Sequence, residues 1–239
     1  MIMPAPSFLR GDQAKIWLNG NTVRGLRAFN VPTAERSLID IEELGQDFDY
    51  QDTGSRRWKA IPVEGNFLTG DATGQDLLRS SFHNDAQLTA IRLYVDEEDF
   101  YAPDTAADPI SCLKVYNEGD SQVTRNGVVP CNFDMIVQGT VALFRIHMTT
   151  LTDVTVVRGL GSEDSVTTTA GDFSAAGFIS GMTLLLGGSG AGANENKMYK
   201  IKTVAAKTLT LETEDVVTGV SDAAIELHGG SLYGIGVDS

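Results

Sequence analysis

The sequence predicts a mainly β protein: a β-sandwich or partly closed barrel with one short flanking helix, followed by a small all-β module. Three observations predict this class. Apolar and polar residues alternate in many short segments, as in half-buried strands. Only the segment around 74–84 has a clear helical spacing of apolar residues. After about residue 149, short apolar runs alternate with glycine-rich turns, which is typical of a compact β module.

This change in composition predicts two domains, 1–149 and 150–239. Of the 25 glycines, 11 lie before residue 150 and 14 lie in the shorter part after it. Both tryptophans and both cysteines lie in the first part. We place the boundary at 148–153. The first domain includes an N-terminal arm, residues 1–13, and a long loop at 42–55.

The overall composition is that of an ordinary globular protein, with 42% apolar and 21% charged residues. The formal charge of −14 would repel phosphate, so a groove that grips nucleic acid is disfavoured, whereas a surface past which DNA slides is not. No apolar run approaches the ~20 residues that cross a bilayer. The start of the chain lacks a signal-peptide pattern, so we expect no secretion. Cys112 and Cys131 are therefore expected to be buried free thiols.

The first elements are a hairpin and a segment with two interpretations. Residues 14–29 predict two strands joined at Asn19-Gly20-Asn21, because these residues tolerate positive φ. Residues 32–45 suit a helix by the spacing of Leu38 and Leu44, or a strand by the alternation around Ile39. We favour the strand.

The acidic loop 42–55 (EELGQDFDYQDTGS) is long for the tip of a hairpin and contains Phe48 and Tyr50. Long loops that keep aromatic residues often mediate interactions. Asp47, Asp49 and Asp52 do not match a calcium loop, because Asp52 and Trp58 occupy the positions of its glycine and its bidentate glutamate. We expect a solvated acidic loop.

The segment 56–96 predicts a strand, a turn, one short helix and another strand, and we expect the rest of the domain to be organised around it. Thr73 and Asp76 have the spacing of a capping box, so the helix should begin at about Gly74. The sequence His83-Asn84-Asp85 should end it. Its apolar side should cover a sheet. That side consists of Leu77, Leu78, Ser81 and Phe82, and the opposite side of Gln75, Arg79 and Ser80.

Strands account for most of the remaining chain. From Leu88 the period becomes two, with Ile91 and Leu93 on one face and Arg92 and Tyr94 on the other. Residues 103–109 are expected to form a loop, and 110–120 and 128–148 strands. Beyond Gly139 the alternation is lost, which indicates a bulge or burial on both sides. The later strands are expected in four segments: DVTVV, FISGMTLLLGG, MYKIKTVAAKTLTLET and AAIELHG.

No motif indicates catalysis, a cofactor or a metal. Gly188 to Ala193 match G-x-G-x-x-A, but a strand-like segment follows where a pyrophosphate site needs a helix, so we expect a flexible hairpin loop. The three histidines lack zinc-site spacing. Trp17 and Trp58 are expected in the core. We predict that the protein is not an enzyme.

The order of these features resembles the major tail tube proteins of long-tailed (siphovirus-type) bacteriophages. The resemblance covers about residues 12–148, from AKIWLNGNTVRGL through GQDLLRSSF to LTAIRLYV. The later pair DFSAAGFISGMTLLLGG and YKIKTVAAKTLTLET is similar to small β modules appended to phage tail proteins.

This resemblance implies hexameric rings that stack into a tube in the virion tail after assembly in the host cytoplasm. It implies as partners further copies of the chain, a tape-measure protein, and terminator or baseplate proteins, with double-stranded DNA passing through the lumen unbound and no membrane contact. The 150–239 module would lie outside the tube. The arm 1–13 and the long loop would make stacking contacts. The expected stacking residues are Asp47, Phe48, Asp49, Tyr50, Asp52, Arg56 and Arg57, and the packing residues of the helix are Leu77, Leu78 and Phe82.

Two other functions stay open. A tail terminator or baseplate hub subunit would share the sheet but would form rings without polymerising. A bacterial carbohydrate-binding or adhesion module would use Trp17 or Trp58 to bind glycans.

Overall fold

A computed structural model describes residues 14–41, 50–95, 99–119, 129–159, 163–212 and 219–232. This part of the chain is mainly β and contains one α-helix, α1, which confirms the predicted class. The molecule is sandwich-like and not a closed barrel, because the sheets of the first part stay open. The predicted N-terminal arm and the tip of the long loop, 42–49, lie outside the described residues.

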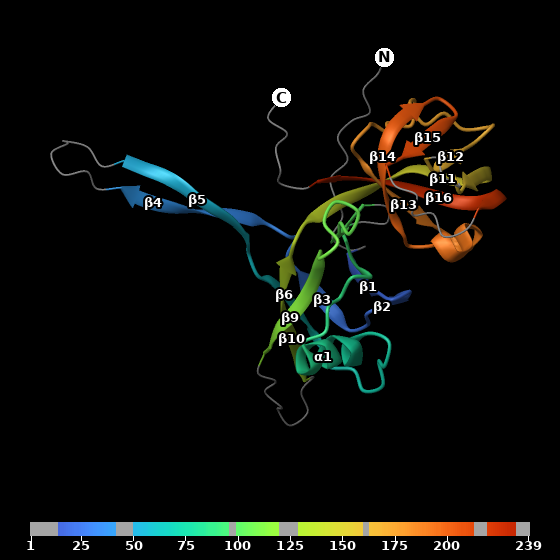
Figure 1. Cartoon of the computed structure of the whole chain (residues 1–239). Helices are drawn as coiled ribbons and strands as arrows, with labels where there is room; N and C mark the ends of the chain where they lie inside the picture. The colour runs from blue at the N-terminus through green and yellow to red at the C-terminus, as the bar shows by residue number, and fades with distance from the viewer. Residues whose placement is uncertain are drawn as a thin grey trace, which may run out of the picture.

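The first part is a sandwich of two antiparallel sheets (Figure 1). One sheet has the order β2-β1-β7-β8-β11 and the other β3-β6-β10-β9. The strands of the first sheet are β1 (Lys15–Leu18), β2 (Asn21–Thr22), β7 (Ile91–Tyr94), β8 (Phe100–Pro103) and the start of β11 (Val141–Val157). The strands of the second are β3 (Leu26–Phe29), β6 (Ile61–Asn66), β9 (Cys112–Glu118) and β10 (Pro130–Gln138).

The core of the first part lies between these sheets and confirms the alternation in β10. Cys131, Phe133, Met135 and Val137 are buried there. Both cysteines are free and buried, as predicted, and burial raises the pKa of each thiol. Strand β8 was not predicted, because no expectation covered the residues just before 103; its last residue, Pro103, had been expected to begin a loop. Phe100 and Ala102 of this strand form a small separate apolar cluster with residues of β11 and with Leu185 of the second part.

The first hairpin has the predicted turn. Asn19 and Gly20 have φ values of 49° and 90°, and Leu18 pairs with Asn21 across a two-residue connection. Two consecutive residues with positive φ are the mark of a type I′ turn, which matches the twist of the joined strands. This turn fixes the register that places Ile16 and Leu18 in the core.

Helix α1 (Gln75–Asn84) forms where predicted, but the capping box was wrong. Gly74 is the N-cap and no side chain caps it. The carboxylate of Asp71 instead accepts the backbone N–H of Gln75 at 2.9 Å, and that of Arg24 at 3.2 Å. Asp85 ends the helix in the left-handed conformation, as the sequence indicated.

The assignment of Gln75 to the polar side of the helix was also wrong, because this side chain is fully buried. Its amide accepts the N–H of Leu68 at 3.0 Å and donates to the carbonyls of Arg24 at 2.7 Å and Asn66 at 2.8 Å. These backbone groups belong to the turns beside the helix. The amide therefore satisfies groups that the sandwich would otherwise bury without partners.

Residues 32–45 contain a strand, as favoured over a helix. Strand β4 (Ala34–Ile41) pairs with β5 (Tyr50–Trp58) in a separate two-stranded sheet. Residues 50–55, predicted as loop, are therefore strand. Figure 1 shows this hairpin as a long arm that leaves the body.

The second part is a compact set of strands arranged as a circuit. Its members are the end of β11, β12 (Ser165–Thr167), β13 (Thr183–Gly187), β14 (Met198–Ala205), β15 (Thr208–Leu211) and β16 (Val220–Leu232). Their pairings run β11-β12-β15-β14-β13-β16 and return to β11. The segment after Gly188 joins β13 to β14 as the predicted hairpin connection and includes the short 3-10 helix η2 (Ser189–Asn194).

Two strands connect the parts without a linker. Strand β11 continues through the predicted boundary 148–153 and pairs with β16 over most of its length. Its first residues pair with β8 and its last with β12. One apolar core nevertheless lies on each side of this boundary. The division into two domains stays a prediction, and the two strands that cross the boundary make the parts structurally continuous.

Candidate assembly surface

The β4–β5 hairpin is held at its base and extends away from the body. The indole Nε1 of Trp58 donates to the carbonyl of Gly139 at 2.9 Å, which attaches β5 to the turn before β11. Within the described residues, β4 pairs only with β5. A lone two-stranded hairpin is marginally stable in water. The far end of this hairpin, where Ile41 pairs with Tyr50, therefore lacks the support that a third strand would give.

Charged residues join the two strands near the base. Arg57 Nε lies 2.9 Å from Glu35 Oε1, and Lys59 Nζ lies 3.3 Å from Glu35 Oε2. Hydrogen bonds from Lys59 and then Arg57 lower the pKa of Glu35. Both pairs are solvent-exposed, so they contribute little stability.

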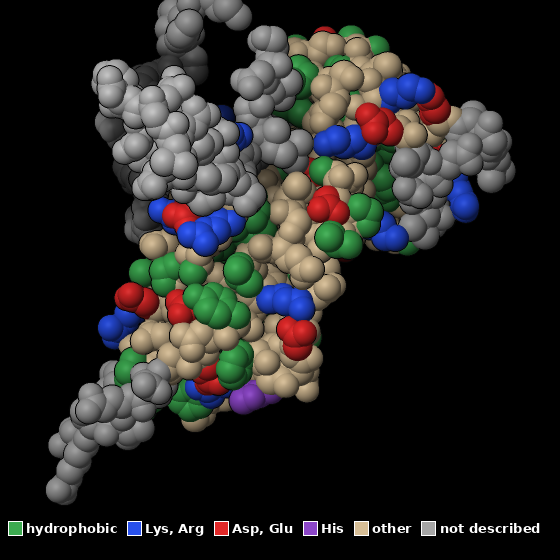
Figure 2. Space-filling view, turned by 60° about the vertical axis from the view of Figure 1, so that its left-hand side comes forward, with side chains coloured by type: hydrophobic (Ala, Val, Ile, Leu, Met, Phe, Trp, Pro, Cys, Tyr) green, Lys and Arg blue, Asp and Glu red, His purple; other side chains and the backbone are tan. Residues whose placement is uncertain are grey.

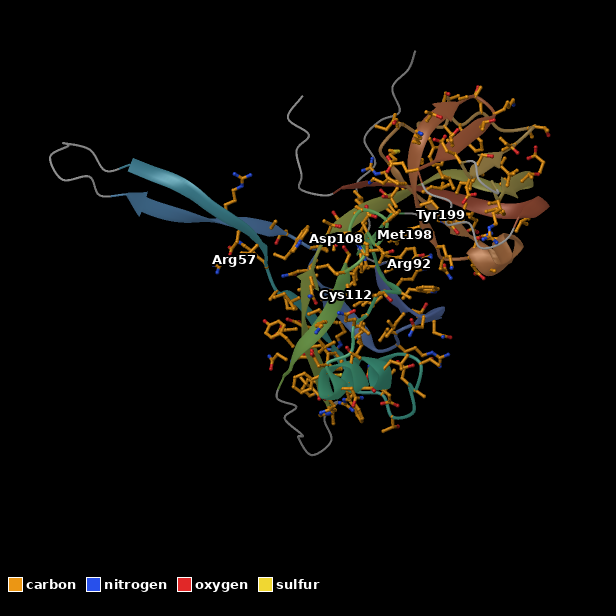
Figure 3. All side chains as sticks on the ribbon, viewed as in Figure 1. Arg57, Arg92, Asp108, Cys112, Met198 and Tyr199 are labelled. Atoms are coloured by element: carbon orange, nitrogen blue, oxygen red, sulfur yellow. The ribbon has the colours of Figure 1, made fainter. Side chains whose placement is uncertain are left out.

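The structure describes four of the seven predicted stacking residues, all of them on β5. Arg57 is exposed near the hairpin base (Figure 3). Tyr50, Asp52 and Arg56 lie on β5, where only the backbone is described. Asp47, Phe48 and Asp49 lie outside the described residues. On the helix, Leu78 is buried, and Leu77 and Phe82 pack against the same core.

Strand edges are the second feature of this surface. Strands β2 and β3 follow each other in the chain and form an edge of each sheet on the same side of the sandwich. Within the described residues, β2 pairs only with β1 and β3 only with β6. An edge strand presents backbone N–H and C=O groups that another chain can pair with. This side of the sandwich can therefore accept a strand.

The outer faces of the first part carry exposed apolar residues. Tyr116, Ile136 and Ile110 are 51%, 40% and 60% exposed. Figure 2 shows apolar side chains among charged ones on this lower part of the molecule. Single exposed apolar residues are normal on monomers, so these residues do not by themselves define an interface.

A cavity of 260 Å³ lies where the two parts meet. Its lining includes Trp17, Thr89, Arg92, Thr105, Asn196 and Lys197. The guanidinium of Arg92 lies 4.5 Å from the ring of Trp17 and 4.9 Å from that of Phe100, and it donates to Tyr94 Oη at 3.3 Å and to Asn196 Oδ1. Figure 3 places Arg92 beside Met198 at this junction.

The sequence did not indicate this cavity. Arg92 had been placed on the polar face of its strand, yet it is only 8% exposed. Its partner across the strands is Trp17, and its contact with Asn196 joins residues 104 positions apart. Such a site can be found only once the pairing of β1 with β7 and the position of the second part are known.

A second polar contact fixes the two parts to each other. Asp104 and Thr183 are both fully buried, and the hydroxyl of Thr183 donates to Asp104 Oδ2 at 2.8 Å. Lys200 Nζ donates to the same hydroxyl at 3.2 Å. A buried carboxylate needs such donors to offset its lost hydration. This contact favours a single relative orientation of the parts.

The described residues contain no group of three or more His, Cys, Asp or Glu side chains that could hold a metal ion. In the same part of the chain, no helix is long and apolar enough to cross a membrane.

No protein-family model and no curated protein matches this chain. Among solved structures it is similar to a chain in the virion of a native gene transfer agent particle, with 16% identity, a TM-score of 0.43, and coverage of 56% of this chain and 97% of that one. It is also similar to a chain of the anti-feeding prophage baseplate, with 12% identity, a TM-score of 0.38, and coverage of 60% of this chain and 97% of that one. A third similar structure is the SPP1 Dit protein, with 12% identity, a TM-score of 0.30, and coverage of 91% of this chain and 94% of that one.

Proposed function

We propose that this chain is a structural subunit of a phage tail that assembles with copies of itself, and more specifically that it forms stacked hexameric rings of the tail tube. The observation that supports this proposal most is the β4–β5 hairpin, which extends from the body and pairs with no other described strand. Such an arm gains stability when a neighbouring subunit covers it. In this role the protein is not an enzyme.

The open side of the sandwich supports lateral contacts. Strands β2 and β3 leave the edge of both sheets available for pairing, and a ring that closes through such edges leaves none to aggregate. We propose that lateral neighbours pair here and that the hairpin contacts the next ring. The charge of −14 would let DNA pass through the lumen without binding. The tape-measure protein and the terminator or baseplate proteins are the further partners of this proposal.

The second part, 150–239, is proposed to lie outside the tube. Its strand circuit has no unpaired edge comparable to β2 and β3, because β12 pairs with both β11 and β15. It therefore has less capacity to extend a sheet between subunits. The virion would be the location of the assembled protein.

Electron microscopy of the purified chain tests this function. At high protein concentration, negative-stain micrographs should show rings and stacked tubes. Size-exclusion chromatography with light scattering should give a mass that rises with concentration. Rings that never stack would favour a terminator or baseplate hub subunit. A monomer at every protein and salt concentration would contradict the proposal.

A further inference from the structure

The junction cavity contains a buried cation without an acidic partner in the described part of the chain. Arg92 is only 8% exposed, and its polar contacts are Tyr94 Oη and Asn196 Oδ1. No described carboxylate oxygen lies within 4.0 Å of its nitrogens. Two of the five N–H groups of the guanidinium are used in these contacts. A buried charge is unfavourable unless it is paired, so this site favours an anion.

The remaining walls of the cavity suit a carboxylate next to an aromatic ring. Lys197 is exposed at the rim and adds a second positive charge. Trp17 offers an aromatic surface beside the guanidinium, and Thr89 and Thr105 are further lining residues. The cavity volume of 260 Å³ is small, so it admits one or two side chains and not a folded element.

The chain itself contains a segment of this chemistry. Residues 42–49, EELGQDFD, carry Glu42, Glu43, Asp47 and Asp49 with Phe48 and no basic residue. Strands β4 and β5, which lead to this segment, extend away from the body (Figure 1), whereas the cavity is lined by residues of β1, β7, β8, β13 and β14. The paired far ends of these two strands therefore point away from the cavity of the same chain.

We propose that the junction cavity binds a carboxylate of the segment 42–49 of a second copy of this chain, with Phe48 beside Trp17. This inference rests on the proposed self-assembly and names its contact site. The ionic contact to Arg92 would be charge-assisted and shielded from water, which makes it strong for a single pair. It would also explain why a chain of net charge −14 keeps two cations at one cavity.

The cavity can be tested with a synthetic peptide of residues 41–51. In a Trp58→Phe background of the full chain, Trp17 is the remaining tryptophan and its fluorescence reports occupation of the cavity. The acidic peptide should change this fluorescence saturably. Arg92→Gln should weaken binding at least about tenfold, as should a peptide with amides in place of its carboxylates. Acetate or phosphate at the same concentration should neither change the signal nor displace the peptide.

Two further variants control for folding. Lys197→Gln changes an exposed side chain and should weaken peptide binding by about threefold to tenfold. Its matched control is Lys202→Gln, whose exposed lysine pairs with Glu163 outside the cavity and should leave binding unchanged. Circular dichroism melting shows whether each variant is folded. Peptide affinity that is unaffected by Arg92→Gln and Lys197→Gln in folded protein would overturn the proposal, as would equal displacement by free acetate or phosphate.

The result can be separated from that of the proposed function. If the chain forms tubes in micrographs but the peptide does not bind at Trp17, only the cavity assignment fails. If the peptide binds in a manner dependent on Arg92 but no rings form, the cavity assignment stands and the tail tube function fails.

Discussion

At the scale of single residues, this fold depends on a few buried polar side chains that satisfy backbone groups in turns. Gln75 and Asp71 illustrate this, because together they bond to backbone groups of two segments beside the helix and to the first N–H of the helix itself. Leaving a buried donor or acceptor without a partner is costlier than losing an average hydrogen bond. These positions should therefore be sensitive to substitutions that preserve size.

Gln75→Met should destabilise the protein by about 2 kcal/mol or more, because it leaves the N–H of Leu68 and the carbonyls of Arg24 and Asn66 without their partner. Urea unfolding followed by circular dichroism measures the change. The matched control, Gln87→Met, alters an exposed residue beyond the helix and should stay within about 0.5 kcal/mol of wild type. Equal stability of the two variants would contradict the role of the amide.

Asp153 provides a prediction about pH. Its carboxylate accepts the backbone N–H groups of Thr169 and Ala170 at 2.6 and 2.7 Å and the hydroxyls of Thr168 and Thr169. The hydrogen bond from the Thr169 hydroxyl, followed by that from the Ala170 N–H, lowers the pKa of this group. The ionised form therefore stabilises the folded state, fully above the ordinary aspartate pKa of about 3.9, and this stabilisation is lost as the pH falls toward the lowered value.

Asp153→Asn should consequently be less stable than wild type at neutral pH, and the difference should shrink as the pH falls below about 4. Unfolding free energies measured in urea between pH 7 and pH 2 give this curve. Glu195→Gln serves as the control, because Glu195 is an exposed acid that does not contact the residues bound by Asp153. Its unfolding free energy should differ less from that of wild type. A difference for Asp153→Asn that grows on acidification would have the wrong sign.

At the scale of elements, the sequence predicts local structure where the apolar residues follow a single spacing, that of a helix or that of a strand. The turn at Asn19 and Gly20, the helix and the alternation in β10 could all be predicted because they depend on neighbouring residues. The contacts of Asp71 could not, since its carboxylate also accepts the N–H of Arg24, 47 residues away. The same holds for Arg92, whose surroundings come from β1 and from the second part.

The long hairpin belongs to the same scale and gives a prediction about assembly. Replacing residues 42–49 by Asn-Gly would join Ile41 to Tyr50, which are paired, through a two-residue turn. The body should keep its stability within about 0.5 kcal/mol, because this segment lies beyond the paired strands. Ring stacking should be lost, since the acidic segment that we propose to contact the neighbouring ring is removed.

Negative-stain micrographs and urea unfolding give the two readouts. Removal of six residues from the segment 120–128, which joins β9 to β10 in the sequence, is the matched control and should leave tubes intact. Long tubes formed by the 42–49 replacement would exclude the tip from stacking.

At the scale of the whole molecule, the two parts share strands and cannot be separated at a linker. The residues of β16 from His228 to Leu232 pair with β11 from Ala142 to Ile146 in the first part. A chain that ends near residue 149 would therefore leave the start of β11 with one open side. We expect such a truncation to aggregate, which would say nothing about the role of the second part.

A shortened chain that keeps both strand segments gives a direct test. Joining Ile146 to His228 through Asn-Gly removes 147–227 and retains the pairing of β11 with β16 beside the sandwich core. Because the edges of β2 and β3 are kept, this chain should still form rings, thinner in cross-section than those of the full chain, whereas the loss of Asn196 and Lys197 from the junction cavity should weaken the stacking of these rings. The cross-section is measured from averaged micrographs, with circular dichroism to establish folding. A folded shortened chain that stays monomeric, while the full chain assembles, would show that the second part contributes to the subunit contacts and does not simply lie outside the tube.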